Sequence, residues 1–180
     1  MESTRAYGDR LPDAAKDIRL NLQAVLGEGS LTERQRFGVA LACAIACRAP
    51  LLRDALVADA GDHLDEAAIE DAQAASAIMA MTNVYYRFRH MVGKPSYASM
   101  PARLRMQRLA QPRTSKVDFE LACLAVSAIH GCEVCVRSHE ATLLAAGVTE
   151  AQVHDAVRIA AVVHAASVAA DAVAADATGF

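Results

Sequence analysis

The sequence predicts an all-α protein, a helical bundle built from two related helical repeats. Alanine occupies 40 of the 180 positions and hydrophobic residues make up 54% of the chain, a composition typical of closely packed helices. Apolar and polar residues never alternate for long, as they would in half-buried strands. Turn-forming residues are sparse and gather in a few clusters that separate the helical runs, at 27–30, 61–65, 93–96, 111–115 and 145–149.

The first long helical run follows the cluster at 27–30. Ser30 and Thr32 offer side-chain oxygens that can cap a helix start, and apolar spacing follows them. Cys43 and Cys47 lie four residues apart inside "FGVALACAIACRAPLL", so they share a helix face. We expect both thiols to be small core residues, because free cysteine is among the most buried residue types. Cys123, in "FELACLAVSAI", receives the same interpretation.

An internal repeat organises the chain, which we interpret as a single domain over residues 1–180. Residues 36–84 can be laid on 118–168 with two extra residues in the later copy, so that the helical pattern of one follows the other. The predicted units are an N-terminal repeat at about 31–87, a linker with one short helix at about 88–115, and a C-terminal repeat at about 116–175.

Chemistry separates the two copies. The second copy has Cys132, Cys135 and His139 where the first has roughly Pro50, Arg53 and Val57. One copy therefore carries the candidate site, and the other is predicted to be scaffold.

Charge and hydropathy exclude several classes of protein. A net charge of −3, a pI near 6.0 and the lack of a long Lys/Arg run argue against a nucleic-acid partner. No apolar stretch of 18 residues is free of charges or histidine, and the first residues lack the apolar core of a signal peptide. The sequence thus predicts a cytoplasmic protein with no membrane contact. Five cysteines without an export signal favour catalytic or metal-binding thiols over a secreted disulfide framework.

The stretch "HGCEVCVRSHE", residues 130–140, concentrates the reactive side chains. If a helix follows Gly131, then Cys132, Cys135 and His139 share one face, because they are spaced by three and four residues. The positive end of a helix dipole stabilises a thiolate, and three residues' separation lets two sulfurs form a disulfide. His139, one turn later, can take a thiol proton.

Glu120 is a candidate fourth member of this site. It precedes Cys132 by twelve residues, so a chain reversal at His130 and Gly131 would bring it back beside the second helix. At about 1.5 Å per residue, Glu120 lies roughly 16 Å from the turn and His139 roughly 12 Å, which makes them near neighbours. A carboxylate there could orient the imidazole, while the alternative is a solvated surface glutamate.

A metal site is the competing interpretation of the same residues. Cys132, Cys135 and His139 could supply three zinc ligands and His130 a fourth, although no second CxxC pair completes the usual structural site. The remaining histidines, which are expected on the surface or in grooves, are His63, His90, His154 and His164. Because His164 lies on an otherwise apolar helix, it is predicted to be a hydrogen-bonded core residue and not a metal ligand. "GEGS" lacks the spacing of a nucleotide-binding loop, so no bound cofactor is expected.

The stretch "FELACLAVSAIHGCEVCVRSHEATLLAAGV" closely resembles the signature of the alkylhydroperoxidase D (AhpD) family, relatives of the carboxymuconolactone decarboxylases. The shared pattern is a glutamate, a CxxC pair twelve residues later, and a histidine four residues beyond the second cysteine. The resemblance extends over most of the chain. It implies an all-helical subunit of two related halves, commonly a homotrimer, that acts as an antioxidant thiol peroxidase and disulfide reductase.

The resemblance also implies residue roles and partners. Cys135 would attack an organic hydroperoxide, Cys132 would resolve the sulfenic acid into a disulfide, and Glu120 with His139 would form the proton relay. The protein would also reduce an AhpC-type peroxiredoxin. Electrons would come from lipoamide on a lipoylated acyltransferase, through dihydrolipoamide dehydrogenase, with no cofactor or metal bound to this chain.

One position departs from the family pattern. The best-known members carry a histidine directly before the second cysteine, and this chain has Val134 there. Any role of that histidine in the proton relay is therefore unsupported in this chain.

Two other classes of function also stay open at this point. One is a carboxymuconolactone decarboxylase-like enzyme that needs no CxxC pair, and the other is a zinc-stabilised oligomer without enzymatic activity.

Overall fold

The computed structural model describes the backbone of residues 1–177 and the side chains of residues 1–172, and every regular element in that part of the chain is a helix. The all-α prediction is therefore confirmed. Residues 178–180 of the predicted domain lie outside the described residues. The α-helices are α1 (Glu2–Gly8), α2 (Lys16–Gly27), α3 (Glu33–Ala46), α4 (Pro50–Ala60), α5 (Glu66–Val92), α6 (Pro95–Ser99), α7 (Gln107–Ala110), α8 (Lys116–Ile129), α9 (Glu133–Ala145) and α10 (Glu150–Ala177), and short 3-10 turns cover Asp13–Ala15 and Gly61–His63.

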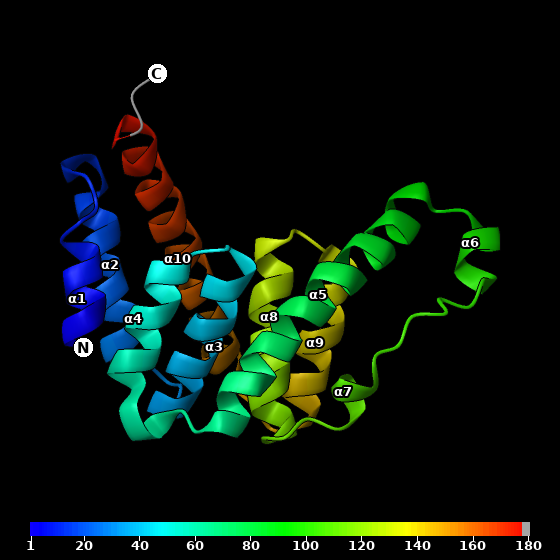
Figure 1. Ribbon diagram of the computed structural model, residues 1–180. Helices are drawn as coiled ribbons and strands as arrows, with labels where there is room; N and C mark the ends of the chain where they lie inside the picture. Colours follow the sequence, from blue (N-terminus) through cyan, green and yellow to red (C-terminus); the bar gives the residue numbers. More distant parts are fainter. Residues whose placement is uncertain (178–180) are drawn as a thin grey trace.

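Two series of three helices, α3–α4–α5 and α8–α9–α10, make up most of the bundle (Figure 1). Their helices have 14, 11 and 27 residues in the first series and 14, 13 and 28 in the second. The central helices α3 and α8 pack on each other, and each also contacts the long third helix of both series. Residues 36–84 and 118–168 thus follow the same order of short, short and long helix. That the two stretches are copies of one repeated unit stays a prediction.

The helix starts follow from local capping chemistry. At α3 the Thr32 hydroxyl accepts a hydrogen bond from the Gln35 N–H, and the Gln35 side chain accepts one from the Thr32 N–H. Asp65 caps α5 and Ser115 caps α8 in the simpler one-bond form. Thr32 therefore fulfils the predicted capping role, whereas the Ser30 hydroxyl instead donates to Asp155 of α10.

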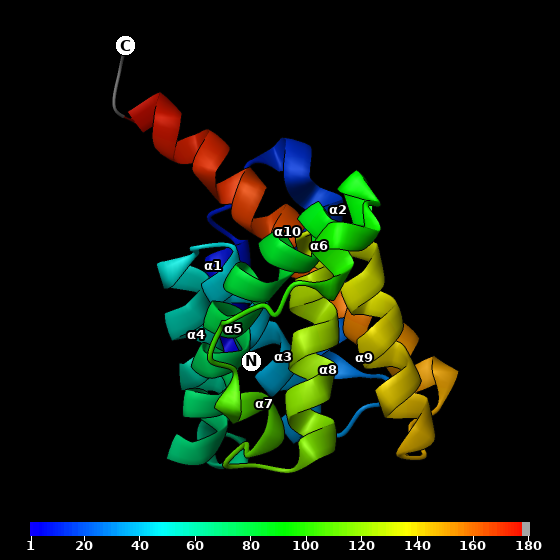
Figure 2. The same ribbon diagram turned by 90° about the vertical axis from the view of Figure 1, so that its right-hand side faces the viewer.

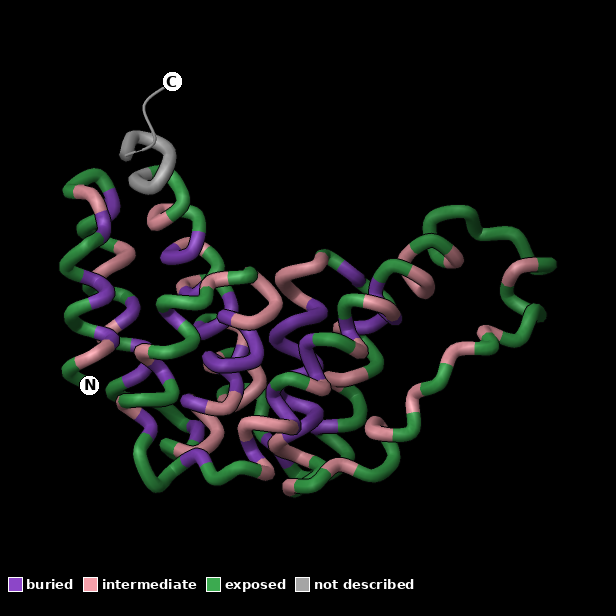
Figure 3. Tube along the Cα trace, viewed as in Figure 1, coloured by how far each residue is buried: buried purple, intermediate pink, exposed green. Residues whose placement is uncertain are grey.

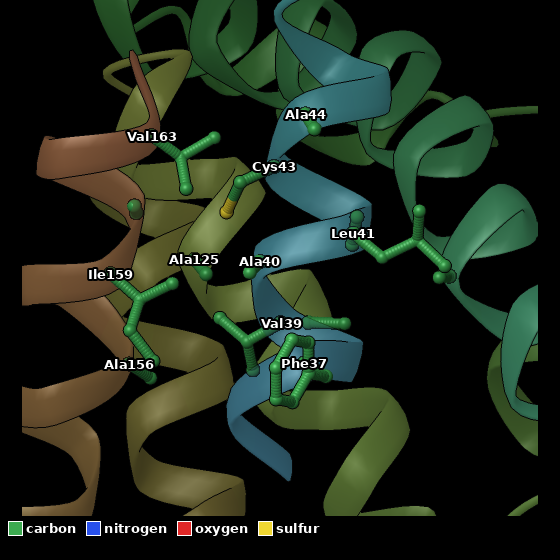
Figure 4. Packing of buried hydrophobic residues seen from close by; sticks show 14 of the residues in the cluster. Phe37, Val39, Ala40, Leu41, Cys43, Ala44, Ala125, Ala156, Ile159 and Val163 are labelled. Atoms are coloured by element: carbon green, nitrogen blue, oxygen red, sulfur yellow. The ribbon is translucent and has the colours of Figure 1, made fainter. Parts of the chain in front are cut away.

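The core lies where α3, α8 and α10 meet, as the buried segments of the Cα trace show (Figure 3). Cys43 of α3 points between α8 and α10 among small side chains such as Ala40 and Ala125, which let the helices approach closely (Figure 4). Cys43 and Cys123 are both fully buried, as predicted. Burial raises the pKa of both thiols, so they stay protonated and serve as apolar core groups.

The prediction that Cys47 lies in the core is wrong. The run from residue 37 to residue 52 is not one helix, because α3 ends at Ala46 and Arg48 adopts a left-handed conformation with φ of 57°. Pro50 then occupies the first turn of α4, where its missing N–H costs no helix bond. Cys47 is consequently a half-buried residue at a helix end, with its sulfur 3.5 Å from Nδ1 of His164.

The linker also differs from its prediction. Helix α5 continues to Val92, where Gly93 ends it with φ of 65°, and the segment that follows contains two short helices instead of one. The last turns of α5 extend beyond the bundle with α6 at their tip, and the chain returns past α7 to α8 (Figures 1 and 2). The return is anchored by Asp71 of α5, whose carboxylate accepts hydrogen bonds from Arg108 and Thr114.

One helix, α10, is long and apolar enough over Glu150–Ala172 to cross a membrane by length and composition alone. It carries charges at Asp155 and Arg158, and it packs on α2, α3 and α8. Ile159 and Val163 of α10 are fully buried in the bundle. One face of α10 is therefore packed into the bundle.

Candidate active site

The turn between α8 and α9 sets the geometry of the site. Helix α8 ends at Ile129, and Gly131 adopts φ of 65°, a left-handed conformation that glycine reaches without a steric penalty. The N–H of Cys132 donates to the Ser127 carbonyl at 3.2 Å and that of Gly131 to Ala128 at 3.1 Å. This pair of bonds is a Schellman motif, which closes α8 and places Cys132 at the start of the next helix.

Cys132 and Cys135 are joined in a disulfide at the N-terminus of α9. Cys132 is the N-cap residue, and the two Cα atoms lie 5.3 Å apart, within the usual range for a disulfide. Cys132 is fully buried, while Cys135 is 7% exposed. On reduction, both sulfurs would face the positive end of the α9 dipole, which favours the thiolate over the thiol.

Glu120 and His139 meet across the α8–α9 hairpin. His139 Nδ1 lies 2.6 Å from Glu120 Oε2, and both side chains are largely buried. The hairpin geometry predicted this neighbourhood, and the alternative of a solvated surface glutamate is wrong because Glu120 is only 6% exposed. An ionised carboxylate can only accept, so Nδ1 carries the proton and donates it, which leaves Nε2 as the free nitrogen of the ring.

Glu120 has a second partner, which carries a positive charge. Lys116, one turn earlier on α8, places its Nζ 2.9 Å from Glu120 Oε1. Burial alone would raise the pKa of the Glu120 carboxyl, but hydrogen bonds from His139 and Lys116 outweigh burial and hold the pKa below its ordinary value. The carboxylate is therefore ionised at neutral pH. Lys116 was missed from the sequence, although its spacing of four residues from Glu120 on a helix was a usable signal.

A pocket of about 350 Å³ opens beside Cys135. Its walls come from three parts of the chain, namely α5, the linker and α9, and its lining is mostly apolar. The lining residues are Met79, Thr82, Tyr86, Met106, Leu109, Val134, Cys135, Ser138 and His139. Because Cys135 and His139 line the pocket and Cys132 does not, only one of the two sulfurs faces the space in which a small molecule could bind.

His130, the upstream histidine of the stretch, points to α5. Its Nδ1 lies 3.1 Å from Asn83 Nδ2, and its backbone carbonyl accepts a hydrogen bond from Arg87. Burial and the nearby charge of Arg87 lower the pKa of the His130 imidazole, so the ring is neutral at neutral pH and can accept from Asn83. These contacts tie the α8–α9 turn to α5.

The other histidines lie on the surface. His63 and His90 form exposed pairs with Glu33 and Glu133, and His154 is exposed on α10. The prediction that His164 is a core residue is wrong, because this position of α10 is exposed beside Cys47. Within the described side chains, no three His, Cys, Asp or Glu residues are grouped to hold a metal ion.

Comparison with known proteins assigns this arrangement to a class. Residues 95–177, which contain the CxxC disulfide, match the Carboxymuconolactone decarboxylase family. The chain is 62% identical over 165 residues to the alkyl hydroperoxide reductase AhpD of Anaeromyxobacter dehalogenans strain 2CP-C, with 92% of this chain and 89% of that protein covered. It is 51% identical over 154 residues to the AhpD of Solibacter usitatus, with 86% and 87% covered. The chain therefore belongs to the alkyl hydroperoxide reductase AhpD family.

Proposed function

We propose that this protein is an alkyl hydroperoxide reductase, an antioxidant thiol peroxidase that reduces organic hydroperoxides through the Cys132–Cys135 dithiol. The observation that carries the proposal is the juxtaposition of a disulfide at the start of α9, a hydrogen-bonded Glu120–His139 pair and an apolar pocket that reaches Cys135. The relatives named alkyl hydroperoxide reductase AhpD support the same activity.

The two cysteines have different exposure, which supports different roles. Cys135 lines the pocket and would attack the hydroperoxide, whereas the buried Cys132 would act only on its neighbour. The Cys135 thiolate takes the terminal oxygen of ROOH, the O–O bond breaks, and the alkoxide leaves as ROH once it gains a proton. The Cys132 thiol then attacks the sulfenic acid, and water leaves as the disulfide forms.

Glu120 and His139 would move the protons that this cycle needs. His139 lines the pocket and has Nε2 free, so it can take the proton of the Cys135 thiol and return it to the departing alkoxide. Glu120 fixes the tautomer through Nδ1 and stabilises the imidazolium that forms, as the third member of a nucleophile, base and orienter set does.

An external dithiol must reopen the disulfide, because each turnover consumes two electrons. We propose dihydrolipoamide for this step, carried by a lipoylated acyltransferase and regenerated by dihydrolipoamide dehydrogenase, and an AhpC-type peroxiredoxin as a second oxidised substrate. The pocket supports the first proposal, because an aliphatic dithiol fits its apolar lining and would reach Cys135 first. The chain would need no bound cofactor or metal of its own.

We further propose that the protein works in the cytoplasm as a homotrimer. The projecting end of α5 exposes Val84, Phe88 and Met91, which are 60%, 46% and 77% exposed and lie on one helix face. A contiguous apolar stripe of this kind is better covered by another subunit than left in water.

Single-serine variants test the function. We expect Cys135→Ser and Cys132→Ser each to abolish dihydrolipoamide-dependent reduction of an organic hydroperoxide, while Cys47→Ser, the matched control at a half-buried thiol, keeps it. Thiol titration of the wild-type protein should gain two thiols on reduction and lose them on addition of hydroperoxide. Full turnover in either site variant would refute the mechanism, and an activity indifferent to both cysteines would favour a decarboxylase-like enzyme. Stoichiometric metal in the purified protein would favour the zinc-stabilised alternative.

A further inference from the structure

Lys116 occupies a position that connects three parts of the site. It begins α8, its Nζ lies 2.9 Å from Glu120 Oε1, and the same ammonium group donates a hydrogen bond to the carbonyl of Leu109. Glu120 in turn contacts His139 of α9 through its other oxygen. Leu109 belongs to α7 and lines the pocket beside Cys135. One side chain thus joins the linker wall of the pocket to the Glu–His pair.

Among the described side chains that contact Glu120, Lys116 is the one with a permanent positive charge. On α8, Cys123 is buried and burial raises its pKa, so it contributes no charge. On α9, His139 is charged only when it holds a second proton. On α5, the buried Asp71 is paired with Arg108. While His139 is neutral, Lys116 is therefore the charged partner that stabilises the ionised form of Glu120.

We propose that Lys116 is a positioning residue of the redox site, which stabilises the ionised Glu120 carboxylate, directs it at His139 and ties this pair to the linker wall of the pocket. The inference rests on the proposed function, because the pair matters only if His139 transfers protons. Its physical basis is that a buried carboxylate bonded only to a neutral imidazole would bind a proton more readily than one that also has an ammonium partner.

The test removes the charge of Lys116 and follows Glu120 directly. Lys116→Met and Lys116→Gln remove the cation with and without a polar end, Lys116→Arg keeps it, and Arg137→Met removes the cation of another i,i+4 ion pair, to Glu133, as a matched control. Carboxyl carbon NMR of the oxidised protein, assigned with Glu120→Gln, gives the titration midpoint of Glu120 without any turnover. Thermal unfolding checks that each variant folds.

We expect the Glu120 midpoint to rise by about one pH unit in both neutral variants, a small shift for a nearby opposite charge because Lys116 is half exposed. The Glu120 midpoint should return to its wild-type value in Lys116→Arg and should equal the wild-type value in Arg137→Met. The acid limb of the pH profile of hydroperoxide turnover should move upward by the same amount, so that rates on that limb fall about tenfold while the plateau holds.

Two results would overturn the inference. One is an unchanged Glu120 midpoint in Lys116→Met and Lys116→Gln, and the other is a shifted midpoint with an unshifted pH profile. Absence of turnover in the wild-type protein would instead refute the proposed function, and it would be recognised before any variant was compared.

Discussion

Asp71 offers a quantitative test of how the fold holds the linker against the bundle. Its carboxylate, 4% exposed on α5, accepts four hydrogen bonds from the end of the linker. The donors are Arg108 Nε at 2.7 Å, the Arg113 N–H at 3.2 Å, and the N–H and hydroxyl of Thr114, both at 2.7 Å. These bonds fix the chain immediately before Ser115 caps α8, so they set where the site helix begins.

We expect Asp71→Asn to lower the free energy of unfolding by about 3 kcal/mol. The amide replaces one acceptor oxygen with an NH2 group that faces two or more donors, and each hydrogen bond to a charged group contributes about 1.5 to 3 kcal/mol. For a chain of this size, that loss corresponds to a fall in Tm of about 6 to 12 °C. Thermal and urea unfolding at fixed protein concentration would measure both quantities.

Asp54→Asn is the matched control, because Asp54 is 65% exposed and its one partner among the described side chains is its neighbour Arg53. Its effect should stay within about 0.5 kcal/mol, as for other exposed ion pairs. A loss below about 1 kcal/mol for Asp71→Asn, or one equal to that of the control, would refute the idea that Asp71 anchors the linker.

The same carboxylate predicts a pH dependence. Burial acts to raise the pKa of Asp71, but hydrogen bonds from Thr114, Arg113 and Arg108 outweigh it and lower the pKa below its ordinary value of 3.8. A lowered folded-state pKa gives stability that is fully present above the unfolded-state value and is lost as the pH falls toward the folded-state value. The stability difference between the wild type and Asp71→Asn should therefore be constant above about pH 5 and shrink below about pH 4.

Two further predictions concern the site hairpin. Gly131→Ala should lower the free energy of unfolding by about 1 kcal/mol, because Gly131 has φ of 65° and alanine is strained in that conformation. The strain is in the backbone, since no atom would contact the added Cβ. An unchanged free energy of denaturant unfolding would contradict the Schellman geometry. Glu120→Gln should reduce hydroperoxide turnover by about 10²-fold or more, because an amide cannot stabilise the His139 imidazolium as a carboxylate does. The disulfide should still form. Turnover within twofold of the wild-type rate would show that Glu120 is not part of the proton relay.

Local sequence patterns were sufficient for the fold class and for the pairing of Glu120 with His139. Both sit at fixed distances from one turn, so helix rise predicted that they would be near neighbours, and the structure places His139 Nδ1 2.6 Å from Glu120 Oε2. The helix ends at 27, 60, 92, 110 and 145 likewise fall at the turn-forming clusters. For the helix ends, the information lies within a few residues of the feature.

Features that depend on neighbouring elements were not predictable in the same way. The break at Arg48 interrupts a run whose composition is helical throughout, and it moved Cys47 from the expected core to a helix end. His164 lies on an apolar helix, but the exposed side of α10 depends on where α8 and α3 pack, which the sequence does not state. The pocket combines α5, the linker and α9, so no single stretch contains its pattern.

Val134 connects the composition of the pocket to the chemistry proposed for it. It lies in the first turn of α9, 38% exposed, and lines the pocket beside Cys135 where the best-known family members carry a histidine. Cys135 and His139 are then the thiol and the imidazole among the residues that line this pocket. In the mechanism proposed above, Cys135 is the nucleophile and His139 supplies the proton for the leaving alkoxide. In that mechanism the Glu120–Lys116 pair behind His139 would have a larger share in proton delivery than in a site with a second pocket histidine.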